Sequence, residues 1–71
     1  MMAGHEHVAK VVEVIGTSDE SVERAIGTAI ARTAETVRNL RWFEVSEIRG
    51  QIDGDKVERY QVMLKIGFAL D

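Results

Sequence analysis

The residues best suited to hold a ligand lie in two segments of alternating side chains in the second half of this 71-residue chain. Alternation over residues 40–51 places Trp42 on one face of a strand, and alternation over residues 56–70 places Gln61 on one face of another. An indole can stack on a flat ring, and the Gln61 amide offers an acceptor and two donors that match the edge of a pyrimidine-like ring. Together they indicate a site for a flat aromatic ligand.

The register of this hairpin decides whether Trp42 and Gln61 share a face. Residues 53–55 read Asp-Gly-Asp, a turn sequence, and we expect Asp53 and Gly54 to form a two-residue turn. In that register both side chains lie on one face, several residues apart along the strands. The two would then serve one pocket only where a second subunit contributes.

The two faces of the predicted hairpin differ in polarity. The apolar face, which can pack on a helix, carries Phe43, Val45, Val62, Leu64, Ile66 and Phe68. The other face carries Trp42, Glu44, Ser46, Ile48, Arg59, Gln61, Met63 and Lys65. A tryptophan on a half-apolar sheet face requires a partner, either another subunit or a flat ligand.

Three roles for Trp42 stay open on this basis. A subunit interface ranks first, because interfaces are the commonest place for such a residue. A platform for an aromatic cofactor ranks second and a platform for a nucleic-acid base third. Single-strand binders use a basic groove with several aromatic residues, whereas this chain has a net charge of −3 with one Trp, one Tyr and two Phe. We therefore expect no nucleic-acid partner.

Two other motifs are weaker candidates for binding sites. His5-Glu6-His7 could place two imidazoles on one face of a strand, but the chain has no Cys and no third His to complete a metal site. Residues 16–20, Gly-Thr-Ser-Asp-Glu, join a strand to a helix but lack the glycine pattern of a phosphate-binding loop. We expect Ser18 to cap the helix instead, and we expect no metal site.

The sequence shows no nucleophile beside a base. Ser46 has no expected histidine neighbour. Alternation predicts that Glu44 and Glu47 lie on opposite faces of their strand, so they would not work as a paired acid and base. We therefore expect a binding protein rather than an enzyme.

The elements that position these residues are predicted in the order β-α-β-β. Residues 8–15 are rich in β-branched side chains and predict a strand. Residues 19–38 predict a long helix that ends near Asn39, its expected C-cap. The apolar stripe of this helix comprises Val22, Ala25, Ile26, Ala29, Ile30, Thr33 and Val37. The fold class is α+β, with a three-stranded antiparallel sheet packed on one long helix, and the pattern leaves open which hairpin strand the first strand joins.

The size of the chain favours assembly. A domain of 71 residues buries only roughly 60% of its unfolded surface and has no disulfide to stabilise it. Gly27, with Ala31 and Ala34, opens a small-residue face on the helix, for which we favour contact with another subunit. No segment predicts a membrane span or signal peptide, so we expect a cytoplasmic protein. We expect residues 1–6 to form a flexible tail and residues 7–71 to form a single domain.

Several segments resemble the dodecins, small flavin-binding proteins of bacteria and archaea. They are Val-Glu-Val-Ile-Gly-Thr-Ser over residues 12–18, Arg-Trp-Phe-Glu-Val over 41–45, Ile-Arg-Gly over 48–50, Tyr-Gln-Val-Met-Leu-Lys-Ile-Gly-Phe over 60–68, and the Ala-Ile and Ala-Arg steps of the helix. The resemblance covers about residues 8–68. It implies the β-α-β-β fold and a hollow homododecamer built as a tetramer of trimers.

The resemblance also implies a ligand and its residues. Flavins would bind as stacked pairs between two symmetry-related tryptophans, a position matched by Trp42, with a glutamine at the flavin edge matched by Gln61. Arg49 matches a basic position near the flavin side chain or phosphate in some bacterial members, whereas a further basic position falls at Ala69.

The function implied is storage and buffering of flavin, with protection against light damage. FMN is the expected ligand, although FAD and riboflavin share the same ring, and some relatives also bind coenzyme A. The alternative is a structural assembly module in which flavin binding is incidental.

Overall fold

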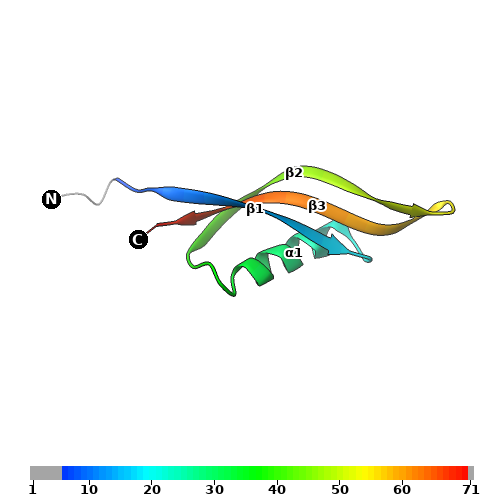
Figure 1. The fold of residues 1–71 in the computed structure, drawn as a ribbon, viewed down its shortest axis with the longest axis horizontal. Coiled ribbons are helices and arrows are strands. Elements are labelled where there is room, and N and C mark those ends of the chain that lie inside the picture. Colours follow the sequence, from blue (N-terminus) through cyan, green and yellow to red (C-terminus); the bar gives the residue numbers. More distant parts are fainter. Residues whose placement is uncertain (1–5, 71) are drawn as a thin grey trace.

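The structure, a computed structural model, describes residues 6–70. Its elements are β1 (Ala9–Ser18), α1 (Val22–Thr33), β2 (Leu40–Asp53) and β3 (Lys56–Ala69). The strands form one antiparallel sheet in the order β1-β3-β2, and α1 covers one face of it (Figure 1). The predicted α+β fold in the order β-α-β-β is confirmed. The sheet also settles the open pairing, because β1 joins β3 and makes β3 the central strand.

The core lies between α1 and one face of β3. Its buried side chains are Val62, Leu64 and Ile66 of β3 and Ala25 and Ala29 of α1. The small alanines let the helix approach the sheet closely. At Gly16 of β1 even a Cβ atom would overlap the backbone oxygen of Ala25. This packing commits one face of the sheet to the helix and leaves the other face uncovered.

The helix begins three residues later than predicted. Ser21 is its N-cap, and the Ser21 hydroxyl accepts a hydrogen bond from the Arg24 backbone N–H at 3.0 Å. Ser18, the expected cap, instead accepts from the Glu20 backbone N–H at 2.9 Å and closes the turn between β1 and α1. Both serines have a hydroxyl that can cap a helix, but the Ser18 hydroxyl is bonded within the turn, so Ser21 forms the cap.

The cap can be tested through stability. We expect Ser21→Ala to lower the free energy of unfolding by about 1 kcal/mol, because the Arg24 N–H loses its acceptor. Ser46→Ala is the matched control, since Ser46 is an exposed serine on β2 outside the helix. Denaturant unfolding at equal protein concentration measures both. An equal loss in the two variants would contradict the assignment of the cap.

The helix also ends earlier than predicted, at Thr33 with Ala34 as its C-cap. Residues 34–36 continue as a turn, and the Val37 N–H donates to the Thr33 carbonyl at 2.9 Å. Asn39 adopts the left-handed conformation expected of it, with φ of 64°. It lies immediately before β2 rather than at the helix end, so the prediction of its place as C-cap is wrong.

The hairpin turn is displaced by one residue from its predicted position. Asp53 pairs with Lys56, so the two turn residues are Gly54 and Asp55, and Gly54 has φ of 69°. The displacement moves the register at the turn by an even number of residues, and the two later shifts, at Gln51/Ile52 and at Val45/Glu47, cancel, so the faces near Trp42 are preserved. Phe43 therefore lies opposite Ile66 on the helix side, as predicted.

A bulge in β2 changes the faces beyond Val45. The register of β2 against β3 shifts between Leu40 and Trp42, between Val45 and Glu47, and between Gln51 and Ile52. The middle shift inserts Ser46 as an extra residue, which reverses the alternation after it. Ile48 consequently lies opposite Val62 on the helix side, and the prediction that it shares the face of Trp42 is wrong.

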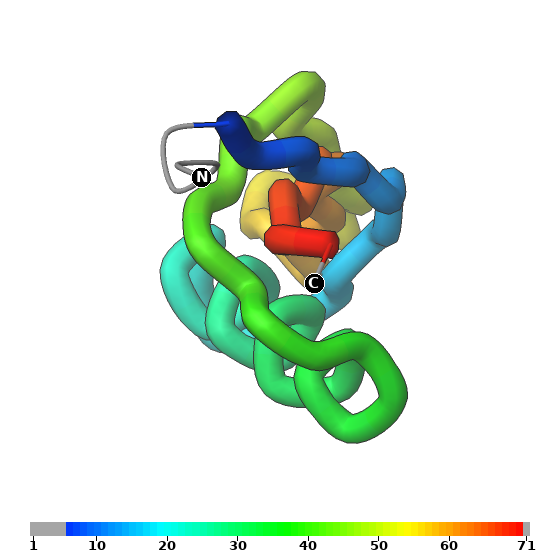
Figure 2. The backbone as a smooth tube through the Cα atoms, turned by 90° about the vertical axis from the view of Figure 1, so that its left-hand side faces the viewer, coloured from blue at the N-terminus to red at the C-terminus, as the bar shows by residue number. Residues whose placement is uncertain are grey.

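The chain is elongated. Its radius of gyration is 15.4 Å, against about 11 Å for a compact domain of this length. The tip of the β2–β3 hairpin extends past β1 and α1 in Figure 1, and the view along the long axis in Figure 2 shows the helix on one side of the sheet. Among the described residues, the exposed large apolar side chains are Val8, Val11, Ile15, Trp42, Phe43, Ile48, Ile52, Val57 and Leu70. One copy of the chain therefore leaves much of its apolar surface uncovered.

Candidate functional site

The face of the sheet away from α1, hereafter the outer face, contains the predicted site residues. Its rows across β1, β3 and β2 are Val11–Gly67–Trp42, Glu13–Lys65–Glu44, Ile15–Met63–Glu47 and Thr17–Gln61–Arg49. Two rows, the first of them fully charged, thus separate an apolar end with Trp42 from a polar end with Gln61. The prediction that both lie on one face is confirmed.

The Trp42 indole lies over Gly67 of the neighbouring strand. A Cβ atom at Gly67 would overlap the ring carbons Cε2 and Cζ2 of Trp42, so only glycine permits this contact. The side chain keeps 47% of its surface exposed. One part of the ring is thus supported by the β3 backbone while the rest stays accessible. Sequence reasoning missed Gly67, and the available signal was a glycine inside a strand, which often marks a close approach.

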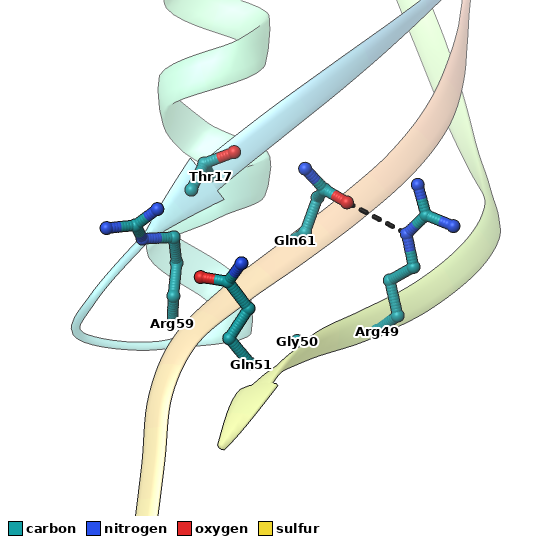
Figure 3. Close-up of a pocket in the computed structure, with 6 residues that line it drawn as sticks. All are labelled: Thr17, Arg49, Gly50, Gln51, Arg59 and Gln61. Atoms are coloured by element: carbon teal, nitrogen blue, oxygen red, sulfur yellow. Dashed lines mark hydrogen bonds between the residues drawn. The ribbon is translucent and has the colours of Figure 1, made fainter. Parts of the chain in front are cut away.

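At the polar end, Gln61 and Arg49 interact directly. The Arg49 Nε donates a hydrogen bond to the Gln61 Oε1 at 2.8 Å (Figure 3). The bulge at Ser46 makes this contact possible, because it brings Arg49 onto the outer face opposite Gln61. The bond orients the Gln61 amide and leaves its N–H groups available to a ligand. The two site residues predicted from the resemblance at this end are therefore adjacent.

A hollow of about 250 Å³ surrounds this pair. It is lined by Thr17, Arg49, Gly50, Gln51, Arg59 and Gln61, from all three strands. Figure 3 shows Gln61 between Arg49 on one side and Arg59 on the other. Sequence reasoning placed Arg59 on this face without giving it a role.

Trp42 and Gln61 do not form one pocket within a chain. Trp42 lies opposite Gly67, six residues from Gln61 along β3, a separation of about 20 Å at roughly 3.3 Å per residue. A small ligand can therefore contact a Trp42 and a Gln61 at the same time only where two copies of the chain each supply one of them.

The bulge also moves the acidic residues. Glu47 lies opposite Met63 and Glu44 opposite Lys65, so both carboxylates are on the outer face. The prediction that they lie on opposite faces is wrong, because it assumed unbroken alternation. Glu44 has a lysine opposite it, and the Glu47 Oε1 lies 4.0 Å from the Arg49 Nη1. Each carboxylate therefore faces a basic side chain.

His5 of the His-Glu-His motif lies outside the described residues. Within residues 6–70 there is no cluster of three or more His, Cys, Asp or Glu that could hold a metal ion. The one helix in this part of the chain is too short and too polar to cross a membrane.

Comparison with known proteins identifies the family. The family model described as Dodecin matches residues 8–71. The chain belongs to the dodecin family. A dodecin of Thermus thermophilus is 53% identical over 64 residues, which cover 90% of this chain and 93% of that protein. A crystal structure of a Thermus thermophilus protein matches with a TM-score of 0.89 and 52% identity, covering 93% of this chain and 97% of the other.

Family membership makes this chain a small binding protein of the oligomeric dodecin type, which agrees with its exposed apolar surface. The ligand does not follow from membership alone. A relative from Mycobacterium tuberculosis named calcium dodecin is 32% identical over 63 residues, covering 89% of each chain. Ligand assignment in this dodecin therefore depends on its own residues.

Proposed function

We propose that this dodecin stores flavin, preferentially FMN, as stacked pairs between symmetry-related copies of Trp42, and thereby limits the photochemistry of the flavin. The observation that carries the proposal is the Trp42 indole, which rests on Gly67 and stays about half exposed. A ring already held against a sheet loses little conformational freedom when a flat ligand stacks on it.

The polar end of the outer face supports recognition of the flavin edge. Arg49 holds the Gln61 carbonyl at 2.8 Å, so the amide is oriented before a ligand arrives. An oriented amide can match the alternating carbonyl and N–H groups of the isoalloxazine ring. Because Gln61 is far from Trp42 in its own chain, we propose that a neighbouring copy supplies the amide.

The expected interactions are strong enough for useful affinity. Stacking on an aromatic side chain contributes ~1–3 kcal/mol for each flat ring, and micromolar binding needs about −8 kcal/mol. Two indoles, a flavin–flavin contact and the amide hydrogen bonds together approach that value. A charged partner such as Arg49 favours a phosphorylated flavin, hence FMN rather than riboflavin.

Storage fits this arrangement better than turnover. A flavin between an indole and a second flavin has no ring face open to a substrate. Indole is easily oxidised, so close stacking on Trp42 is expected to quench flavin fluorescence and the light-driven chemistry that accompanies it. We therefore propose a binding protein rather than an enzyme.

A fluorescence titration of the purified, assembled protein with FMN, FAD and riboflavin tests the proposal. We expect quenching that saturates near one flavin per chain on a symmetric particle of about twelve chains. Strong residual flavin fluorescence at saturation would overturn the protective role. A large particle without any quenching would favour the alternative, a structural assembly module in which Trp42 is an interface residue.

A further inference from the structure

We infer that the hollow around Gln61 is an anion subsite in which Arg59 binds a phosphoryl group. The inference rests on the proposed function where the phosphoryl group is the flavin's own 5′-phosphate, and it is independent of that function where the group belongs to a separate molecule. Both sources present the same chemistry to Arg59.

The composition of the hollow favours an anion. Apart from Gly50, its lining side chains are two arginines, two glutamines and a threonine, and no carboxylate lines it. These groups are rich in hydrogen-bond donors, and the two guanidinium groups carry positive charge. This positive charge is local to the hollow, since the chain as a whole has a net charge of −3.

Arg59 is the more available of the two arginines. The Arg49 Nε is committed to Gln61 at 2.8 Å, and the Arg49 Nη1 lies 4.0 Å from Glu47. Among the described residues, no carboxylate lies within ion-pair distance of Arg59. Its guanidinium lies on the opposite side of Gln61 from Arg49, near Thr17 (Figure 3).

The position of Arg59 suits a role in specificity. Arg59 lies opposite Gln51, one row beyond the row that contains Gln61. If Gln61 binds the edge of the ring, Arg59 is therefore placed to bind a substituent that lies outside the ring. A guanidinium can bind phosphate oxygens through two N–H groups at once.

The test compares flavins with and without phosphate. Dissociation constants for FMN and riboflavin are measured by fluorescence quenching on wild type, Arg59→Gln and Arg38→Gln, an exposed arginine outside the sheet that serves as control. Binding of inorganic pyrophosphate to the flavin-free proteins is measured by calorimetry. Light scattering confirms that the particle mass is unchanged in each variant.

We expect Arg59→Gln to weaken FMN binding about 10-fold, while riboflavin binding and the Arg38→Gln control stay within about twofold of wild type. Arg59→Lys should recover part of the loss, because it keeps the charge but not the forked donors. This pattern would place the flavin's own phosphate in the subsite. Equal affinity for FMN and riboflavin, combined with pyrophosphate binding that Arg59→Gln abolishes, would indicate a separate phosphate-bearing molecule.

Two results would overturn the inference. The first is an equal loss of FMN and riboflavin affinity in Arg59→Gln. The second combines two findings: wild type binds FMN and riboflavin equally well, and its pyrophosphate binding is either absent or unchanged in Arg59→Gln. If no flavin binds at all, the proposed function fails, and the pyrophosphate measurement still decides the anion subsite.

Discussion

Replacement of Trp42 by alanine is expected to lower flavin affinity about 10- to 100-fold, since loss of one stacking surface removes ~1–3 kcal/mol and each 1.4 kcal/mol is tenfold. Quenching of the flavin that still binds should fall as well, because the indole in contact with the ring is gone. The measurement is the same flavin titration, with particle mass followed by light scattering.

Trp42→Phe is the matched variant for this experiment. It keeps an aromatic surface over Gly67 but a smaller and less easily oxidised one, so we expect intermediate affinity and reduced quenching. An intact particle with unchanged affinity in Trp42→Ala would remove Trp42 from the flavin site. Dissociation of the particle would identify Trp42 chiefly as an interface residue.

The second large effect is expected at Gly67, a residue that would not itself contact flavin. In Gly67→Ala the new Cβ overlaps the Cε2 and Cζ2 atoms of Trp42, so the indole must leave its place on β3. We expect flavin affinity to fall at least about 10-fold with Trp42 still present, close to the effect of deleting the ring. A change in near-ultraviolet circular dichroism of the single tryptophan would report the displacement directly.

Gly27→Ala is the control for this experiment. A Cβ atom at Gly27 meets no heavy atom within 4 Å in the chain, and the residue lies on α1, away from the outer face. The tryptophan spectrum should be unchanged in this variant, and flavin affinity should be unchanged as long as the particle mass is that of wild type. Its particle mass also tests the expectation that Gly27 opens the helix to another subunit. An unchanged indole spectrum in Gly67→Ala would contradict the positioning role of Gly67.

Much of the site was predictable because alternation along a strand is a local property. Phe43 and Trp42 fall on opposite faces whatever the register, because successive side chains of a strand alternate. Their partners on β3 stay on the same faces when the register moves by an even number of residues. A turn displaced to Gly54 and Asp55 left both faces correct near Trp42, because the register shifts at Gln51/Ile52 and at Val45/Glu47 cancel each other. The helix was predictable from its apolar stripe, but its limits were not, because Ser18 and Ser21 have equal chemistry as caps.

The contacts that build the site depended on neighbouring strands. The bulge at Ser46 is a property of the pairing of β2 with β3, and no alternation pattern in β2 indicates it. That bulge places Arg49 beside Gln61 and moves Glu47 to the face of Glu44, where sequence reasoning had not placed it.

The sequence alone was sufficient for the order of elements, the composition of the two sheet faces near Trp42 and the resemblance to a family, since each depends on residue types at short spacing. Three features required the folded chain: β3 as the central strand, Gly67 beneath Trp42, and Arg49 beside Gln61. Each is a contact between strands, or a consequence of their pairing. Such contacts depend on register, twist and bulges, which are properties of the paired backbone and not of either segment by itself.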